Sequence, residues 1–220
     1  AGGTDYYPAR VERPLAEDVL DVSGLTALRA IETAGDDLRI GAGVTWSELI
    51  ATHLPRCFDG LKQAARAAAG RQIQNAGTIA GNICNASPAA DGIPPLLTLD
   101  ARVELASLEG TRALPLDQFV TGNRRTRRRP DELMTAILVR PPAGAARSRF
   151  LKLGARKYLV ISIVMVAAIL EEAEDGTVAA ARIAVGACSA VAQRLPALEA
   201  ALVGRRLEPR LGSAVEPDHL

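Results

Sequence analysis

Two short segments of small residues carry most of the chemistry that this sequence can offer. They read "AGGTD" at residues 1–5 and "TIAGN" at residues 78–82. Glycine lets a backbone approach a ligand closely and adopt positive φ, and successive exposed N–H groups form a concavity that binds anions such as phosphate. Two such loops that clamp one pyrophosphate would explain both segments. Simple turns are the alternative, because the same residue types are common in turns.

Two familiar nucleotide signatures are absent around these segments. No G-K-[ST] follows the glycines, as a P-loop requires, and no G-x-G-x-x-G lies on a strand–helix unit, so a Rossmann site is not supported. Asp91 follows the second segment in "AADGIPP". An acid at that place suits the ribose or ribityl hydroxyls of a dinucleotide. An Asx turn at Asp91-Gly92 is the open alternative.

Conventional catalytic groups are scarce. The chain has two histidines, His53 and His219, and the sequence suggests no Ser/His/Asp or Cys/His arrangement and no metal-ligand spacing. We therefore expect no catalytic side chain and no metal site. A bound cofactor would have to supply any redox chemistry.

Composition argues against nucleic acid and membrane as partners. The 26 basic and 25 acidic residues give a net charge of +1, so no global field favours either surface. The longest apolar run, residues 158–170, is too short to span a bilayer and is predicted to be a buried strand. Three widely spaced cysteines without a C-x-x-C motif fit a reducing cytoplasm. The basic run at 124–129 is expected to be a solvated loop, with docking to an acidic partner or phosphate as the alternative.

The elements that position the first segments are predicted from periodicity and turn chemistry. Thr45 and Glu48 fit a capping box at the start of a helix. Residues 75–94 are rich in Gly, Asn and Pro and are predicted to be a long loop, which in a compact domain is usually functional. Before this loop we predict a strand and turn over 18–25, a helix or strand over 25–35, a strand and helix over 37–54, and a helix over 58–70.

Residues after the long loop predict mainly strands. A short helix or turn and a strand are expected over 94–107, followed by a hairpin with its turn at Glu109-Gly110. We further predict a strand over 131–142, an antiparallel meander after a linker at 141–148, and a helix over 195–204. The chain is therefore expected to form two domains, residues 1–140 and 146–220.

Four segments in this order and spacing resemble a known family. They are "AGGTD", "NAGTIAGNICNASPAADGIPPLLTLDA", "DELMTAILVRPP" and "FLKLGARKYLVISIVMVAA". They are similar to the FAD-binding subunit of molybdenum hydroxylases, the family of xanthine dehydrogenase and aerobic carbon monoxide dehydrogenase. The resemblance implies an α+β fold: a p-cresol methylhydroxylase-type FAD-binding domain over 1–140 and a small C-terminal α+β domain with an antiparallel sheet over 146–220. It also implies that the first domain lacks its N-terminal part and the second its C-terminal part.

The resemblance also implies cofactor-binding residues, position by position. Ala80 stands where the family commonly has glycine, and its methyl group is tolerable if φ there is negative. Ala68 replaces an aromatic residue of other members, which puts stacking at that point in doubt. Tyr158 would line the exposed face of the flavin or belong to the core. The two pyrophosphate loops would comprise Ala1, Gly2, Gly3, Thr4, Asp5 and Tyr6, and Thr78, Ile79, Ala80, Gly81 and Asn82.

Three further positions match residues near the rest of the cofactor. Asp91 matches an acid that bonds FAD hydroxyls, Met134 an aliphatic position beside the isoalloxazine, and Lys152 a basic residue near the flavin ring. A lysine at that place would stabilise negative charge that develops on reduction. A surface lysine on a strand is the alternative for Lys152.

The function implied by the resemblance is electron transfer through FAD in a multi-subunit oxidoreductase. Electrons would come from [2Fe-2S] clusters of an iron–sulfur subunit and from a molybdopterin-binding subunit, and would leave to NAD+ or another acceptor. The alternatives are a stand-alone flavoprotein reductase of the same fold type and a degenerate subunit that only scaffolds its partners.

Overall fold

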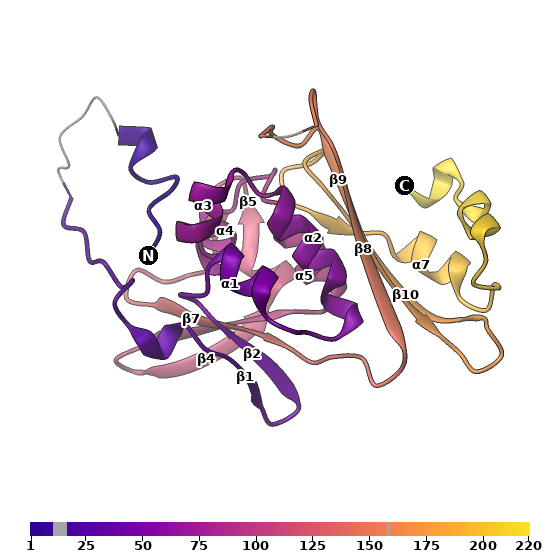
Figure 1. Ribbon diagram of the computed structural model, residues 1–220, viewed down its shortest axis with the longest axis horizontal. Helices are drawn as coiled ribbons and strands as arrows, with labels where there is room; N and C mark the ends of the chain where they lie inside the picture. The colour runs from indigo at the N-terminus through magenta and orange to yellow at the C-terminus, as the bar shows by residue number, and fades with distance from the viewer. Residues whose placement is uncertain (11–16, 158) are drawn as a thin grey trace.

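Five antiparallel strands form the first sheet of the computed structural model, which describes residues 1–10, 17–157 and 159–220 (Figure 1). Ser107 lies opposite Gly110, which confirms the predicted hairpin, although its turn is Leu108-Glu109 and not Glu109-Gly110. The predicted strand within 18–25 is wrong, because Asp21 accepts a hydrogen bond from the Ser23 N–H and closes a local turn. The strands are, in spatial order, β1 (Ile31–Ala34), β2 (Asp37–Gly41), β7 (Leu133–Val139), β3 (Arg102–Ser107) and β4 (Gly110–Pro115).

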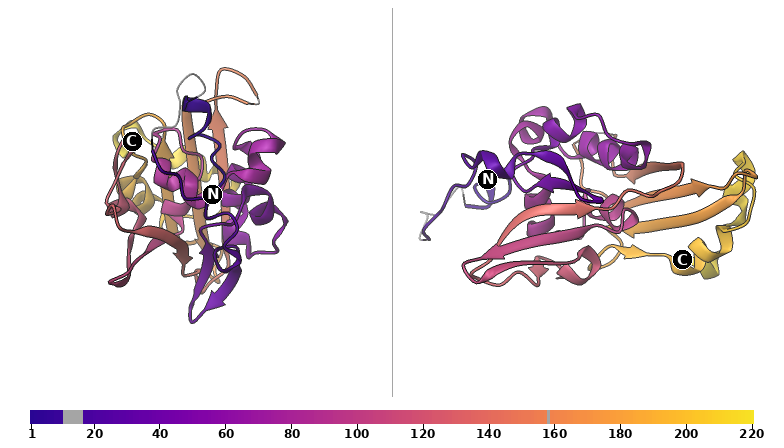
Figure 2. Two further views of the ribbon diagram at one scale, coloured as in Figure 1. Left: turned by 90° about the vertical axis from the view of Figure 1, so that its left-hand side faces the viewer. Right: turned by 90° about the horizontal axis from the view of Figure 1, so that it is seen from below.

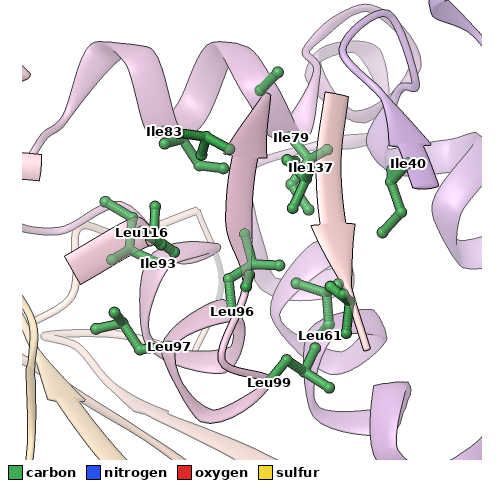
Figure 3. Close-up of a cluster of buried hydrophobic side chains, with 14 of the residues drawn as sticks. Ile40, Leu61, Ile79, Ile83, Ile93, Leu96, Leu97, Leu99, Leu116 and Ile137 are labelled. Carbon is green, nitrogen blue, oxygen red and sulfur yellow. The ribbon is translucent and has the colours of Figure 1, made fainter. Parts of the chain in front are cut away.

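Five short helices gather over this sheet (Figure 1). They are α1 (Trp46–Ala51), α2 (Asp59–Ala67), α3 (Arg71–Ala76), α4 (Ile79–Asn85) and α5 (Ile93–Thr98). The capping box at the start of α1 is confirmed, since Thr45 and Glu48 bond each other reciprocally. Figure 3 shows the core between helices and strands, where Ile40, Ile79 and Ile137 meet. Small and aliphatic side chains make up most of this core, and Phe58 and Phe119 are its largest fully buried side chains.

The long loop predicted over 75–94 is wrong, because α4 and the start of α5 lie within it. Thr78 caps α4, and Ala86 ends it with a left-handed φ of 47°. Ile79 and Ile83 lie four residues apart and are both fully buried in the core. Their packing outweighs the low helix propensity of the Gly and Asn residues beside them, because tertiary burial stabilises short amphipathic helices more than propensity does.

The second sheet has the order β11-β10-β9-β8, which confirms the antiparallel meander. Successive side chains of a strand point to opposite faces. Met165 and Ala167 of β9 therefore pack toward α2, while Val166 and Ala168 pack toward α7. Helices α2 and α5 lie between the two sheets (Figure 2). The elements are β8 (Ala146–Leu153), β9 (Val164–Glu172), β10 (Val178–Gly186), β11 (Gln193–Arg194) and α7 (Pro196–Leu202).

The predicted α+β class is confirmed by this combination of helices and antiparallel sheets. The strand predicted over 158–170 begins only at Val164. Before it, Ile161 and Ile163 are exposed and Ser162 is buried.

Among the described residues, no helix is long and apolar enough to cross a membrane. The remaining elements are α6 (Leu116–Phe119), β5 (Val120–Gly122), β6 (Arg125–Thr126) and 3-10 helices at 8–10, 26–28, 56–58, 209–214 and 217–219.

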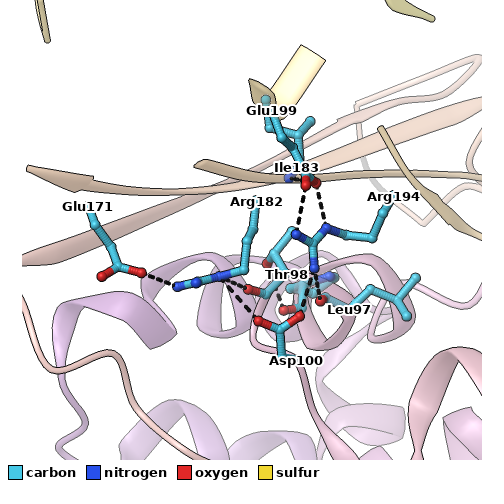
Figure 4. Close-up of polar contacts among 9 residues, drawn as sticks. Leu97, Thr98, Asp100, Glu171, Arg182, Ile183, Arg194 and Glu199 are labelled. Carbon is cyan, nitrogen blue, oxygen red and sulfur yellow. Dashed lines mark hydrogen bonds and ion pairs between the residues drawn. The ribbon is translucent and has the colours of Figure 1, made fainter. Parts of the chain in front are cut away.

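Two arginines of the second sheet hold the C-terminal end of α5 (Figure 4). Arg182 donates to the Thr98 carbonyl at 2.9 Å, and Arg194 donates to the Asp100 carboxylate at 2.7 Å. The last carbonyls of a helix have no partner within the helix, so cations at this end satisfy them and interact favourably with the helix dipole. Arg194 also binds Glu199 of α7. The two arginines therefore join α5, the second sheet and α7.

An Arg194→Met protein is expected to unfold with a free energy lower by about 2 kcal/mol, because charged hydrogen bonds to Asp100, Glu199 and the Leu97 carbonyl are lost. Urea unfolding followed by circular dichroism measures the change. Arg210→Met is the matched control, since the Arg210 side chain is exposed and has no bonded partner within the described chain. Equal unfolding midpoints for the two variants would contradict the stabilising role of the Arg194 hydrogen bonds.

Candidate functional site

The first segment forms a tight loop that depends on two glycines. Gly2 and Gly3 have φ of +73° and +63°, the left-handed region that residues with a Cβ disfavour. A Cβ on Gly2 would lie 2.6 Å from the Ala76 carbonyl oxygen, so glycine alone allows the loop to approach the end of α3. The backbone N–H groups of Gly2, Thr4 and Asp5 meet no acceptor among the described residues. The loop therefore presents donors to a ligand.

The second segment is the beginning of α4. The Thr78 hydroxyl oxygen accepts from the Gly81 N–H at 2.9 Å, so this N–H is used within the segment. The N–H groups of Thr78 and Ala80 have no acceptor in the described parts of the chain. The Ala80 methyl group is buried, and its backbone is helical with negative φ. The alanine therefore does not obstruct the loop, as expected for a position with negative φ.

Both segments line one cavity of about 660 Å³. This volume lies within the range of roughly 300–1,000 Å³ that is typical of ligand and cofactor sites. Two stretches far apart in the sequence therefore converge on one space. The predicted residues that line it are Ala1, Gly3, Thr4, Asp5, Tyr6, Thr78, Gly81, Asn82 and Asp91.

The other predicted residues lie around this cavity. Gly2 supports the first loop and lines a second cavity of about 640 Å³, which Gly3 and Thr78 also line. The Ile79 side chain points into the core (Figure 3), so this residue can offer a ligand only its backbone. Ala80 and Met134 line a smaller neighbouring hollow of about 190 Å³. There the Met134 sulfur lies 3.9 Å from that of Cys84, and burial raises the pKa of the Cys84 thiol to about 11.

Asp91 and Lys152 form a buried ion pair. The Lys152 ammonium donates to both carboxylate oxygens at 3.0 Å, and the Ser162 hydroxyl donates to one of them at 3.1 Å. The two side chains are 11% and 12% exposed. Burial raises the pKa of Asp91, and the ammonium and the hydroxyl oppose that rise. Lys152 comes from β8 of the second sheet, so this pair ties that sheet to the cavity wall.

Several cavity residues were not predicted from the sequence. Trp46 is 3% exposed, and its indole lies beside Gly77 and Gly92. Arg124 also lines the cavity. Trp46 could have been suspected because it is the single tryptophan of the chain, and Arg124 because it begins the basic run whose alternative role is phosphate binding. Ala68 lines the cavity too, and Tyr158 lies outside the described residues.

The donors and acceptors of the cavity suit a dinucleotide with a diphosphate. Unpaired N–H groups come from both segments, and such groups form anion-binding concavities. Asp91 supplies carboxylate oxygens for hydroxyl groups, and Trp46 supplies an apolar wall. Asn82 of α4 also fixes the segment that precedes α5, because its side-chain oxygen accepts a hydrogen bond from the Gly92 N–H at 3.1 Å.

Comparison with protein families gives two matches that together span most of the chain. Residues 1–142 match the FAD binding domain in molybdopterin dehydrogenase. Residues 149–215 match the CO dehydrogenase flavoprotein C-terminal domain.

Individual proteins show the same similarity. The chain is 35% identical over 175 residues to the nicotinate dehydrogenase FAD-subunit of Eubacterium barkeri, covering 74% of this chain and 57% of that protein. It is 31% identical to the nicotine 6-hydroxylase medium subunit of Paenarthrobacter nicotinovorans, covering 97% of this chain and 75% of that one. Against the putative xanthine dehydrogenase FAD-binding subunit of Escherichia coli (strain K12), it is 36% identical and spans 59% of that length.

The fold agrees with solved structures as well. A chain of carbon monoxide dehydrogenase from Hydrogenophaga pseudoflava superposes with a TM-score of 0.87 at 29% identity. The superposition covers 97% of this chain and 75% of that chain. Quinoline 2-oxidoreductase from Pseudomonas putida 86 gives a TM-score of 0.86 at 26% identity over the same shares.

Proposed function

Because the chain belongs to the family of FAD binding domains in molybdopterin dehydrogenases, we propose that it is the FAD-carrying, electron-transferring subunit of a molybdenum-containing hydroxylase. The convergence of the two glycine-containing segments on one cavity carries this proposal. FAD supplies, when bound, hydride- and electron-transfer chemistry. The side chains and backbone of this chain hold and orient it.

The two segments divide the work of binding. The N–H groups of the cavity residues Thr4, Asp5 and Thr78 donate to the diphosphate, and Asp91 accepts from cofactor hydroxyls. Lys152 keeps the Asp91 carboxylate ionised and in place, because the ammonium lies against both of its oxygens. Trp46 forms an apolar part of the cavity wall, and the buried Ala80 and Met134 line the neighbouring hollow.

We also propose where the electrons come from and where they go. Electrons reach this subunit from [2Fe-2S] clusters of an iron–sulfur subunit that also serves a molybdopterin-binding subunit, and they pass on to NAD+ or another acceptor. The relatives that support this role are named as FAD or medium subunits of dehydrogenases and hydroxylases. We also propose a division into two domains near residues 140–146, where β7 has ended and β8 begins.

Titration of FAD into the cofactor-free protein is expected to quench the fluorescence of Trp46 and to saturate at one equivalent. Trp46 is the single tryptophan of the chain and lines the cavity. The visible absorbance of protein-bound flavin after gel filtration is the second readout. A folded protein that shows no saturable quenching and retains no flavin would exclude FAD binding and favour a scaffold. Addition of NADH without oxygen then tests the acceptor, because bleaching of the flavin requires NAD(H) to react with this subunit.

A further inference from the structure

Arg124 joins three parts of the chain that form the cavity. It lies in the turn between β5 and β6, at the start of the basic run. Its Nη1 atom donates to Asp5 Oδ2 at 2.9 Å and to Asn85 Oδ1 at 2.7 Å. Its backbone N–H donates to the Ala86 carbonyl at 2.8 Å. One residue therefore connects the first loop to the C-terminal end of α4.

The backbone of Arg124 is held in an uncommon conformation. Its φ is 55°, in the left-handed region that few non-glycine residues adopt. Such a conformation persists when surrounding contacts determine it, and residues of this kind cluster at functional sites. The hydrogen bond to the Ala86 carbonyl is one such contact, and the two side-chain bonds are the others.

Asp5 raises an electrostatic difficulty in the first loop. A carboxylate beside an anion-binding set of N–H groups repels a diphosphate, since like charges at short range disfavour each other. The ion pair with Arg124 removes that net charge. The pair itself is more than half exposed, with side-chain exposures of 60% and 54%, so it adds little to folding stability. The Asp5–Arg124 ion pair therefore affects the charge of the cavity more than it affects the stability of the fold.

The guanidinium also keeps unused donors. Both bonds of Arg124 use Nη1, and Nε and Nη2 have no partner in the described chain. The other arginine of the cavity, Arg10, is engaged with Glu17 and lies over the Tyr6 ring at 3.8 Å. Among the residues that the structure describes, Arg124 therefore keeps two of its three guanidinium nitrogens free for an anion, whereas both terminal nitrogens of Arg10 are engaged. Guanidinium groups bind phosphate oxygens through such paired donors.

We propose that Arg124 is a binding residue for the diphosphate of FAD, which it serves by neutralising Asp5, fixing the first loop to α4, and donating from Nε and Nη2. This inference rests on the proposed FAD binding and names the cation that such a site needs. It assigns a role to the first residue of the basic run, which the sequence suggests is a solvated loop.

The FAD dissociation constant of an Arg124→Gln protein, measured by Trp46 quenching, is expected to rise about 30-fold. Arg124→Lys keeps the charge without the planar fork and is expected to recover only part of this loss. Arg127→Gln is the matched control, because Arg127 belongs to the same run and its exposed side chain has no bonded partner in the described chain. Its dissociation constant should stay within about twofold of the unchanged protein.

Charge neutralisation has its own test. Adding Asp5→Asn to Arg124→Gln is expected to lower the dissociation constant about fivefold, since the uncompensated carboxylate is gone. A merely structural Arg124 would not show this rescue. An Arg124→Gln protein that binds FAD as tightly as the Arg127→Gln control, or one that Asp5→Asn does not rescue, overturns the inference. Failure of the unchanged protein to bind FAD would instead overturn the proposed function.

Discussion

A Gly2→Ala protein is expected to bind FAD at least about 100-fold more weakly than the unchanged protein. Both the backbone conformation and the space around residue 2 are unfavourable for alanine. The φ of +73° is unfavourable for alanine, and the new Cβ would lie 2.6 Å from the Ala76 carbonyl oxygen. Backbone atoms cannot turn away as a flexible side chain can. The loop must therefore move off α3, and the N–H groups of Thr4 and Asp5 leave the cavity wall. Trp46 quenching by FAD measures the loss.

Gly24→Ala is the matched control for this experiment. Gly24 lies in the same N-terminal region, its φ is not in the left-handed region, and a Cβ there would contact nothing within 4 Å. We expect its FAD affinity to match that of the unchanged protein. Equal affinities for the Gly2 and Gly24 variants would show that the first loop does not need its approach to α3 in order to bind.

Replacement of Lys152 by methionine is expected to lower the free energy of unfolding by about 3–5 kcal/mol at pH 7. Removing one partner of a buried ion pair leaves the other charge without compensation. Asp91 is only 11% exposed, and among the described residues it keeps only the Ser162 hydroxyl as a partner. Urea unfolding measures the change. Arg147→Met on the same strand is the control, because Arg147 is exposed and its side chain bonds to nothing in the described chain.

Two further measurements separate lost charge balance from lost packing. The double variant Lys152→Met with Asp91→Asn is expected to recover much of the stability, since no buried charge remains. A double variant that is no more stable than the single one would mean that Lys152 contributes by packing.

The pH dependence of the Lys152→Met protein follows from the buried carboxylate. Burial raises the pKa of Asp91, and loss of the ammonium raises it further, above the value of about 3.9 in the unfolded chain. A group whose folded pKa is raised stabilises the fold fully below its unfolded pKa, and this contribution is lost as pH rises through the folded pKa. The deficit relative to the unchanged protein should therefore be smaller at pH 4 than at pH 7. A deficit independent of pH would contradict the assignment.

Local signals in the sequence identify many of the elements correctly. The Thr45/Glu48 capping box, the hairpin over 102–115 and the strand over Leu133–Val139 are confirmed. Each depends on residues that are neighbours in the chain, such as a cap and its N3 partner or alternating apolar side chains. Signals of this range do not require knowledge of the rest of the fold.

The errors arise where distant packing decides the structure. Residues 79–85 have turn-like composition, yet they form α4 because Ile79 and Ile83 meet the sheet core. Residues 159–163 look like part of a buried strand, yet Ser162 turns inward to Asp91 while Ile161 and Ile163 are exposed. In both places the deciding partners lie far away in the sequence. The four-residue spacing of Ile79 and Ile83 is the local signal in this segment that favours a helix.

The residue types that could make a cofactor site can be read from the chain alone: two glycine segments, an acid at 91 and a lysine at 152. How these residues meet depends on tertiary packing. It brings both segments to one cavity, joins Asp91 to Lys152, and places Trp46 and Arg124 in the wall. Residue chemistry and local backbone preference depend on the residue type and its neighbours in the chain, so they can be predicted from the sequence. The meeting of residues 5, 85 and 124 depends on the packing of helices and turns around one core, which no short stretch specifies.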